Sequence, residues 1–212
     1  MDLHALEAPF LKYFRTKRLS LLYRSMPISN SSRVLDLGGS LFFWELAHQQ
    51  GLPVPKITIV NWDKPRTPVP PYAEWIVADA LQLTFPDHEF DIVFCNSLIE
   101  HLGTRESQEK LAKQIQRLAP RYFVQTPHRR FPFEPHLLTP FVHWFPASLR
   151  KKMIRNFTVW GLLARPSHAQ CEMLVNEISL LDTRTMASLF SGGEIHVESF
   201  MGMPKSVIAI RI

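Results

Sequence analysis

The sequence predicts an α/β fold built on an open, largely parallel sheet. Short apolar runs alternate with segments of helical periodicity, and most connections between them are short. Many of these runs end in polar side chains, which is typical of the sheet edge where the carboxyl ends of parallel strands meet a ligand. Two further runs near the C-terminus are joined by a tight turn, so one of them must run antiparallel to the rest.

The first elements surround a turn rich in glycine. Residues 2–26, within an N-terminal helical segment over 1–30, have apolar side chains at helical spacing and predict a basic amphipathic helix. We expect it to pack at the edge of the core or to cover a ligand. An apolar strand over 33–37 then leads through Gly38 and Gly39 into a helix over 41–50. Backbone N–H groups at the start of that helix offer a place for an anionic group.

The middle of the chain continues the alternation. A strand at 56–60 is followed by 64–71, whose four prolines exclude a helix and predict an extended connection. Two more strands are expected at 74–77 and 90–95. The remaining elements are a helix over 105–118, a strand over 121–125, a helix over 182–190, and strands over 194–200 and 206–210 around a Gly-Met-Pro turn.

Residues 128–181 interrupt this alternation and predict a helical or irregular insert after the fifth strand. The stretch 128–168 contains seven Lys and Arg residues, one acidic residue and many aromatic residues and prolines. It is typical of a lid that packs over the site, and two alternatives stay open. One is a surface that contacts anionic lipid, and the other is a pocket in which Arg129 and Arg130 hold a phosphate.

Composition restricts the classes of protein that remain. The chain has 212 residues, of which 46% are apolar and 20% charged, which suits one globular domain and excludes global disorder. Its net charge of +5 fits a phosphate-bearing substrate, an anionic membrane face or a nucleic acid, although no nucleic-acid module is recognised. Two cysteines make neither a disulfide framework nor a zinc site, and we expect a cytoplasmic protein. No signal peptide and no membrane-spanning run are expected.

Three motifs resemble those of the class I S-adenosylmethionine-dependent methyltransferases. They are Val34-Leu-Asp-Leu-Gly38, Val77-Ala-Asp-Ala80, and the run from Phe90 to His101 that ends in Glu-His. The resemblance covers about 33–127 and 182–212. It implies a Rossmann-like, seven-stranded, mostly parallel sheet with an antiparallel last strand, and S-adenosyl-L-methionine as cofactor. The sequence departs from the family pattern at two places. Ser40 stands at the place of the second glycine, and the proline-rich connection replaces the helix after the second strand.

The resemblance also implies a cofactor site. Gly38 and Gly39 correspond to the turn that approaches the methionine part, with Asp36 near its amino group. Asn61 aligns with the acid that holds the ribose, and Asp63 follows two residues later. The expected set is completed by Asp79 and Ala80 beside the adenine and by Asn96 and Ser97 near the sulfonium.

Histidines after the fourth and fifth strands are the expected general bases. His101 and His128 follow strand ends that flank the predicted site, and an imidazole titrates near neutral pH. His101 is equally suited to capping or orienting its loop, and His128 to contacting the substrate or fixing its loop by hydrogen bonding. We expect Arg129, Arg130, Glu134 and His136 to contact the substrate, and we expect no metal.

These observations predict an enzyme that methylates a small-molecule or lipid-like acceptor, with oxygen as the preferred atom. An alternative is a non-catalytic, methyltransferase-like protein that binds a partner or lies peripherally on a membrane through 128–168. A nicotinamide-dependent oxidoreductase is disfavoured, because Phe42 or Phe43 stands near the place of the third glycine of that fingerprint.

Overall fold

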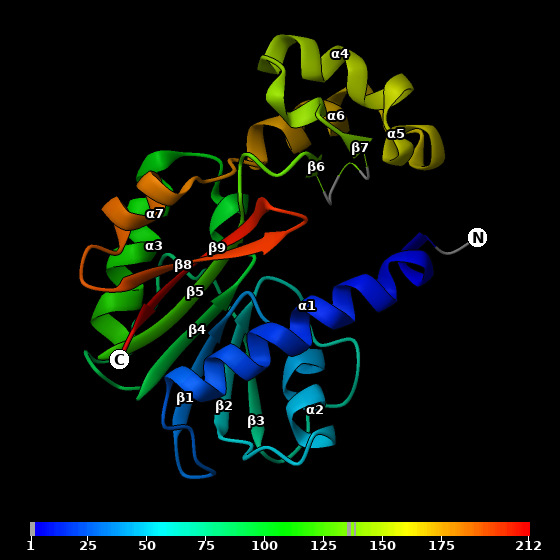
Figure 1. The fold of residues 1–212 in the computed structure, drawn as a ribbon. Coiled ribbons are helices and arrows are strands. Elements are labelled where there is room, and N and C mark those ends of the chain that lie inside the picture. The colour runs from blue at the N-terminus through cyan, green and yellow to red at the C-terminus, as the bar shows by residue number, and fades with distance from the viewer. Residues whose placement is uncertain (1–2, 135–136, 138) are drawn as a thin grey trace.

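The computed structural model describes residues 3–134, 137 and 139–212, and is centred on a seven-stranded sheet (Figure 1). The strand order is β3-β2-β1-β4-β5-β9-β8, and only β9 runs against the others. The predicted mostly parallel sheet with an antiparallel last strand is therefore confirmed. The strands are β1 (Arg33–Leu37), β2 (Lys56–Asn61), β3 (Ala73–Val77), β4 (Ile92–Asn96), β5 (Arg121–Pro127), β8 (Glu194–Phe200) and β9 (Met203–Arg211).

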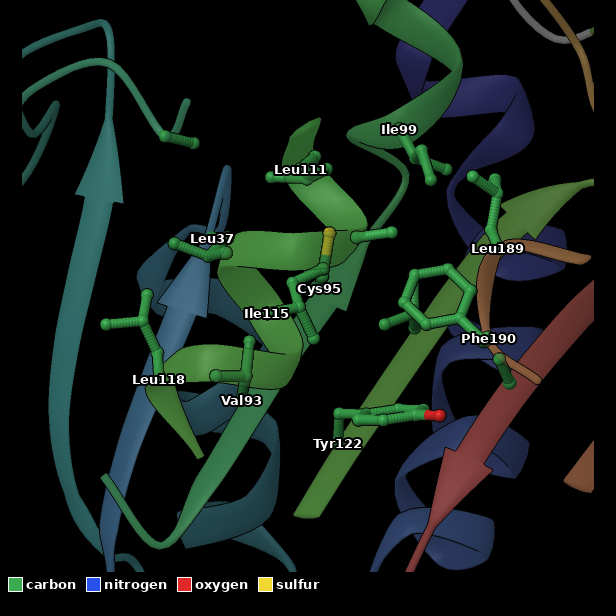
Figure 2. Packing of buried hydrophobic residues seen from close by; sticks show 14 of the residues in the cluster. Leu37, Val93, Cys95, Ile99, Leu111, Ile115, Leu118, Tyr122, Leu189 and Phe190 are labelled. Carbon is green, nitrogen blue, oxygen red and sulfur yellow. The ribbon is translucent and has the colours of Figure 1, made fainter. Parts of the chain in front are cut away.

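Helices cover both faces of the sheet. On one face α1 (Leu3–Ser25) and α2 (Leu41–Gln49) bury apolar side chains against β1, β4 and β5. On the other face lie α3 (Arg105–Leu118) and α7 (Thr183–Leu189). Figure 2 shows this second core, in which Leu111, Ile115 and Leu118 of α3 lie among side chains of the sheet such as Leu37 and Val93.

The pleat of the strands brings distant polar residues to one face of the sheet. Phe94, Phe123 and Ile208 pack in the core beneath α1 and α2. Because side chains alternate along a strand, residues two positions away from these face the same helices. At the carboxyl edge of the parallel strands, the polar residues on this face are Asp36, Asn96, Gln125 and Ser206.

Element boundaries agree with the sequence to within a few residues, except in the C-terminal hairpin. The helix over 105–118 and the strand over 33–37 have the predicted bounds, and 64–71 contains no helix. β5 continues to Pro127 because it pairs with Ser206 of β9. The last strand was expected to begin at 206, but it begins at Met203. A shift of register between Glu198 and Ser199 accommodates Pro204 inside it.

The insert forms a separate group of short elements. They are β6 (Phe133–Glu134), β7 (Thr139–Pro140), η2 (Val142–Trp144), α4 (Ala147–Phe157), α5 (Val159–Ala164) and α6 (His168–Glu177). Leu137, Ile154 and Cys171 belong to its own small core. An isolated bridge between His128 and Leu181 joins the two ends of the insert. Within the described residues, no helix is long and apolar enough to cross a bilayer.

Candidate active site

The turn after β1 brings the backbone against a buried carboxyl group. Gly38 has a φ of +70°, and a Cβ there would lie 2.9 Å from the Leu98 side chain, so both its conformation and its contact require glycine. A Cβ on Gly39 would lie 2.0 Å from Oδ2 of Asp36. Ser40 has a φ of −139° and a ψ of 161°, an extended backbone that any residue adopts. Serine at the place of the second glycine therefore introduces no backbone strain.

Asp36 lies at the centre of this turn and is fully buried. The indole Nε1 of Trp44 donates a hydrogen bond of 2.8 Å to Oδ2. Burial raises the pKa of Asp36 to about 7, and the Trp44 hydrogen bond opposes that rise. Oδ1 has no hydrogen-bond partner among the described residues. The carboxyl group therefore keeps one acceptor available for a ligand.

Two adjoining cavities meet at this turn. The main cavity, of about 320 Å³, extends along the carboxyl edge of the sheet from β1 to β9 beneath α1. The second, of about 450 Å³, lies between the turn and the segment that follows β2. Gly38, Gly39, Ser40 and Phe42 line both cavities. A ligand with two parts can therefore cross the turn and place one part in each cavity.

Most of the predicted cofactor residues surround these cavities. Asp36, Gly38, Gly39, Asn96 and Ser97 line the main cavity. Ser97 has a φ of +59°, and its hydroxyl donates to Gln125. On this side the sequence prediction and the cavity lining agree.

Of the four remaining residues predicted to bind the cofactor, two line the second cavity and two do not. Both Asn61 and Asp63 line it. The Asn61 amide donates to the Gly39 carbonyl and accepts from the backbone N–H of Asp63, so the Asp63 carboxylate is the better placed group for ligand hydroxyls. Asp79 and Ala80 line neither cavity. The Asp79 carboxylate instead accepts from the backbone N–H of Leu81 and from Gln82.

The two histidines predicted as bases lie outside both cavities. Nδ1 of His101 is 3.4 Å from the Glu177 carboxylate of α6. His128 is buried, and its Nδ1 accepts from the backbone N–H of Arg130, so Nε2 carries the proton and donates to Thr183. Burial lowers the pKa of His128, against the effect of Asp182. These contacts fix loops, which is the alternative role that the sequence left open.

Two of the four predicted substrate residues lie outside both cavities. Arg129 and Arg130 are exposed and belong to neither cavity lining. The Arg129 carbonyl accepts a hydrogen bond from Trp144. His136 lies outside the described residues, and Glu134 is placed only by its backbone in β6. Among the residues that the structure describes, no three His, Cys, Asp or Glu side chains form a metal-binding group.

Several residues that line the main cavity were not predicted from the sequence to be site residues. Arg15, Arg18 and Lys205 line it, together with the rings of Phe14, Phe131 and Phe133. One signal was present in the sequence, because Arg18 lies four residues from both Phe14 and Leu22 and so interrupts an apolar stripe of α1. Nothing local marked Lys205, which reaches the cavity only through the pairing of β9 with β5.

Comparisons with known proteins bear on the fold. Residues 56–121 match a family model described as a methyltransferase domain. No curated protein matches the sequence. One similar structure is a Haemonchus contortus phosphoethanolamine N-methyltransferase solved with phosphomonomethylethanolamine and S-adenosylhomocysteine. It has a TM-score of 0.55 and 16% identity over 86% of this chain, which spans only 38% of that protein.

In two other similar structures, the aligned region covers most of both chains. A chain from the Haloferax volcanii complex of the Trm112 methyltransferase activator with a candidate methyltransferase has a TM-score of 0.57 and 11% identity, over 98% of this chain and 92% of that one. A Rhodobacter sphaeroides structure, titled as candidate zinc-dependent alcohol dehydrogenases, has a TM-score of 0.56 and 13% identity, over 87% and 84%. Similarity at this identity shows the fold alone. The matched family model covers 56–121, and together with the strand order it supports the class I S-adenosylmethionine-dependent methyltransferase fold that the three motifs predict.

Proposed function

We propose that this protein methylates a small-molecule acceptor, with S-adenosylmethionine as the methyl donor. The observation that carries the proposal is the buried carboxyl group of Asp36, a residue that lines the main cavity at the glycine turn and whose Oδ1 has no partner among the described residues. Such a group suits a ligand that carries positive charge and hydrogen-bond donors. When bound, S-adenosylmethionine supplies an electrophilic methyl group on a sulfonium.

The residues around the turn divide the binding between them. Gly38 and Gly39 allow the ligand to approach the backbone, and Asp36 accepts from its amino group. The Asp63 carboxylate is placed to hold hydroxyl groups in the second cavity. Asn96 and Ser97 form the floor of the main cavity, next to the reacting end. This division keeps the roles expected of Asp36, the two glycines, Asn96 and Ser97, and moves the ribose contact from Asn61 to Asp63. It assigns no role to Asp79 and Ala80, which line neither cavity.

The main cavity is shaped to exclude water from the acceptor. Phe14, Phe131 and Phe133 line it, and the ring of Phe14 is buried. Alignment of an acceptor with the methyl carbon in a dry pocket accelerates displacement without any covalent contribution from the protein. We keep oxygen as the acceptor atom, since an oxygen that arrives already ionised needs no base. The positions of His101 and His128 outside the cavities do not oppose it.

Equilibrium titration with S-adenosylhomocysteine tests the proposal. We expect the intact chain to bind it, and Gly39→Ala to abolish detectable binding, because the added Cβ overlaps the Asp36 carboxylate that Trp44 holds in place. Gly192→Ala is the matched control, since its Cβ would meet only the end of the Arg211 side chain at 3.8 Å. Absence of binding to the unmodified chain at millimolar ligand contradicts the proposal.

We further propose that the insert contacts an anionic membrane surface. Phe157, Leu162 and Leu163 are each at least 59% exposed on α4 and α5, beside the exposed Lys152 and Arg155. Apolar side chains interleaved with cations suit the interface of a bilayer that contains anionic lipid. This contact is compatible with methyl transfer to a lipid-like acceptor, and equally with a non-catalytic role.

A further inference from the structure

We propose that the end of the main cavity between α1 and β9 is an oxyanion-binding subsite, so that the methyl acceptor is a small apolar acid. The inference rests on the proposed function for the role of the ligand as acceptor. Binding of the anion itself depends only on residues of this chain. Arg18 of α1 and Lys205 of β9 converge on this end of the cavity, whereas the Arg15 guanidinium lies 4.8 Å from the centroid of the Phe42 ring near the glycine turn.

Arg18 is the centre of the subsite. Its side chain is buried, with the residue only 8% exposed, and it crosses from α1 to the edge of the sheet. Nη1 donates to Asn96 at 3.2 Å, and Nη2 donates to Glu198 at 3.1 Å and to Ser206 at 3.4 Å. Nε is buried with no hydrogen-bond partner among the described residues. A guanidinium held in this way presents a fixed donor to the cavity, and an oxyanion is its best acceptor.

Among the residues that the structure describes, positive charge at this end exceeds negative charge. Glu198 is the carboxylate in contact with the cluster, and Arg18, Ser206 and Lys205 all contact it. The Lys205 ammonium lies 3.5 Å from Glu198 and 3.9 Å from the centroid of the Phe14 ring. Burial, together with the charge of Arg18, lowers the pKa of Lys205 to about 8 and that of Arg15 below its usual range. Arg18 and Lys205 thus share the Glu198 carboxylate, and an incoming anion relieves their mutual repulsion.

The remaining acids of the cavity lie elsewhere. Asp36 is on β1, and three interstrand steps of about 4.8 Å place it about 14 Å from β9. Glu100 accepts from Thr126, whose neighbours Val124 and Val207 pack on the α3 side of the sheet. The cavity is therefore polarised, with a carboxyl group at the glycine turn and cations at the far end. This polarity suits a positively charged donor and an anionic acceptor placed end to end.

The walls of the subsite specify the rest of the ligand. Phe14 and Phe131 are buried, both rings pack against Phe200, and Phe133 completes the lining. A volume of about 320 Å³ for the whole cavity admits only a small acceptor. The combination of apolar walls and a cationic end fits a compact carboxylic acid better than a sugar or a nucleotide.

Calorimetric titration with benzoate tests the subsite directly. The probe is added to the full chain saturated with S-adenosylhomocysteine at low salt, with benzamide as the uncharged analogue of the same shape. We expect benzoate to bind at least about tenfold more tightly than benzamide, as charge-assisted hydrogen bonds predict. Lys205→Gln and Arg18→Gln should each weaken benzoate binding about tenfold or more. Arg24→Gln is the matched control, because Arg24 is an exposed cation of the same helix.

The outcomes separate this inference from the proposed function. If S-adenosylhomocysteine binds but benzoate does not, the subsite is refuted and the cofactor site stands. If Lys205→Gln weakens S-adenosylhomocysteine instead of benzoate, the cations serve the carboxylate of the cofactor, and the inference is also refuted. If S-adenosylhomocysteine fails to bind but benzoate binds with the expected sensitivity to Arg18 and Lys205, the anion subsite stands without the proposed activity.

Discussion

Asp36 shows how one buried group affects both stability and binding. Its carboxyl is enclosed at the end of β1, and the raised pKa means that the folded protein holds a proton more tightly than the unfolded chain. The stabilisation from this proton is complete below pH 4 and is lost as the pH rises towards 7. Above pH 7 the protein keeps a buried carboxylate that only Trp44 and a bound cation can compensate.

Asp36→Asn should remove this pH dependence. For the unmodified chain, a folded pKa of about 7 reduces the free energy of unfolding by about 2–3 kcal/mol between pH 5 and pH 8, and the variant should lack this loss. Urea denaturation measures the free energy of unfolding at both pH values. Because the change between the two pH values is compared, any pH-independent cost of the substitution cancels. Asp63→Asn, which removes an exposed carboxyl group that lines the second cavity, is the matched control. Equal slopes for Asp36→Asn and the unmodified chain would show that Asp36 is ionised across this range.

At the scale of elements, the sequence predicted best those that bury an apolar face on the sheet. The bounds of α3 are correct because Thr104 caps its first turn and Leu111, Ile115 and Leu118 mark one face. Two helices of the insert, α4 and α5, lack a comparable buried face. In α4, Ile154 is the only residue classed as buried, and α5 has six residues, so neither presents a full amphipathic face.

Gly161 is the position on which the packing of α4 and α5 depends. A Cβ there would lie 1.9 Å from the Ile154 carbonyl and 2.7 Å from that of Arg155, and both are backbone atoms. Gly161→Ala must therefore separate the two helices, at a cost of about 1–3 kcal/mol within the insert. Hydrogen exchange should accelerate over 147–164 while S-adenosylhomocysteine binding stays the same. Gly192→Ala should leave exchange in these helices unchanged, and unaltered exchange in Gly161→Ala would contradict the close packing.

At the scale of the whole molecule, the site combines residues that the sequence could and could not indicate. Asp36, Gly38 and Asn96 were predictable, because each follows a strand within a local motif and the ends of parallel strands meet. Arg18 and Lys205 are far apart in the sequence and meet only when α1 crosses the sheet and β9 pairs with β5. His101 and His128 were expected beside the cavity and lie outside it, because strand order alone does not fix the direction in which a loop side chain points.

Charge is also unevenly distributed over the whole molecule. Residues 128–168 carry seven Lys and Arg residues and one acidic residue, in a chain whose net charge is +5. The insert leaves the sheet after β5, and Figure 1 shows α4, α5 and α6 grouped apart from the sheet. If the insert contacts a membrane, the attraction should depend on anionic lipid and on salt, because the contribution of each cation is screened over a Debye length.

Co-sedimentation with phosphatidylcholine vesicles, with and without phosphatidylserine, tests this surface. We expect binding only with phosphatidylserine, and the double variant Lys152→Glu with Arg155→Glu should weaken it at least about tenfold, since each cation near the surface contributes about 1 kcal/mol. Leu162→Ser with Leu163→Ser should weaken it as well, by removing the apolar contact. Lys110→Glu with Lys113→Glu is the control for net charge, because it reverses two exposed cations of α3, outside the insert. Equal binding by the α3 double variant and the insert double variant would mean that net charge, and not the insert, attracts the vesicles.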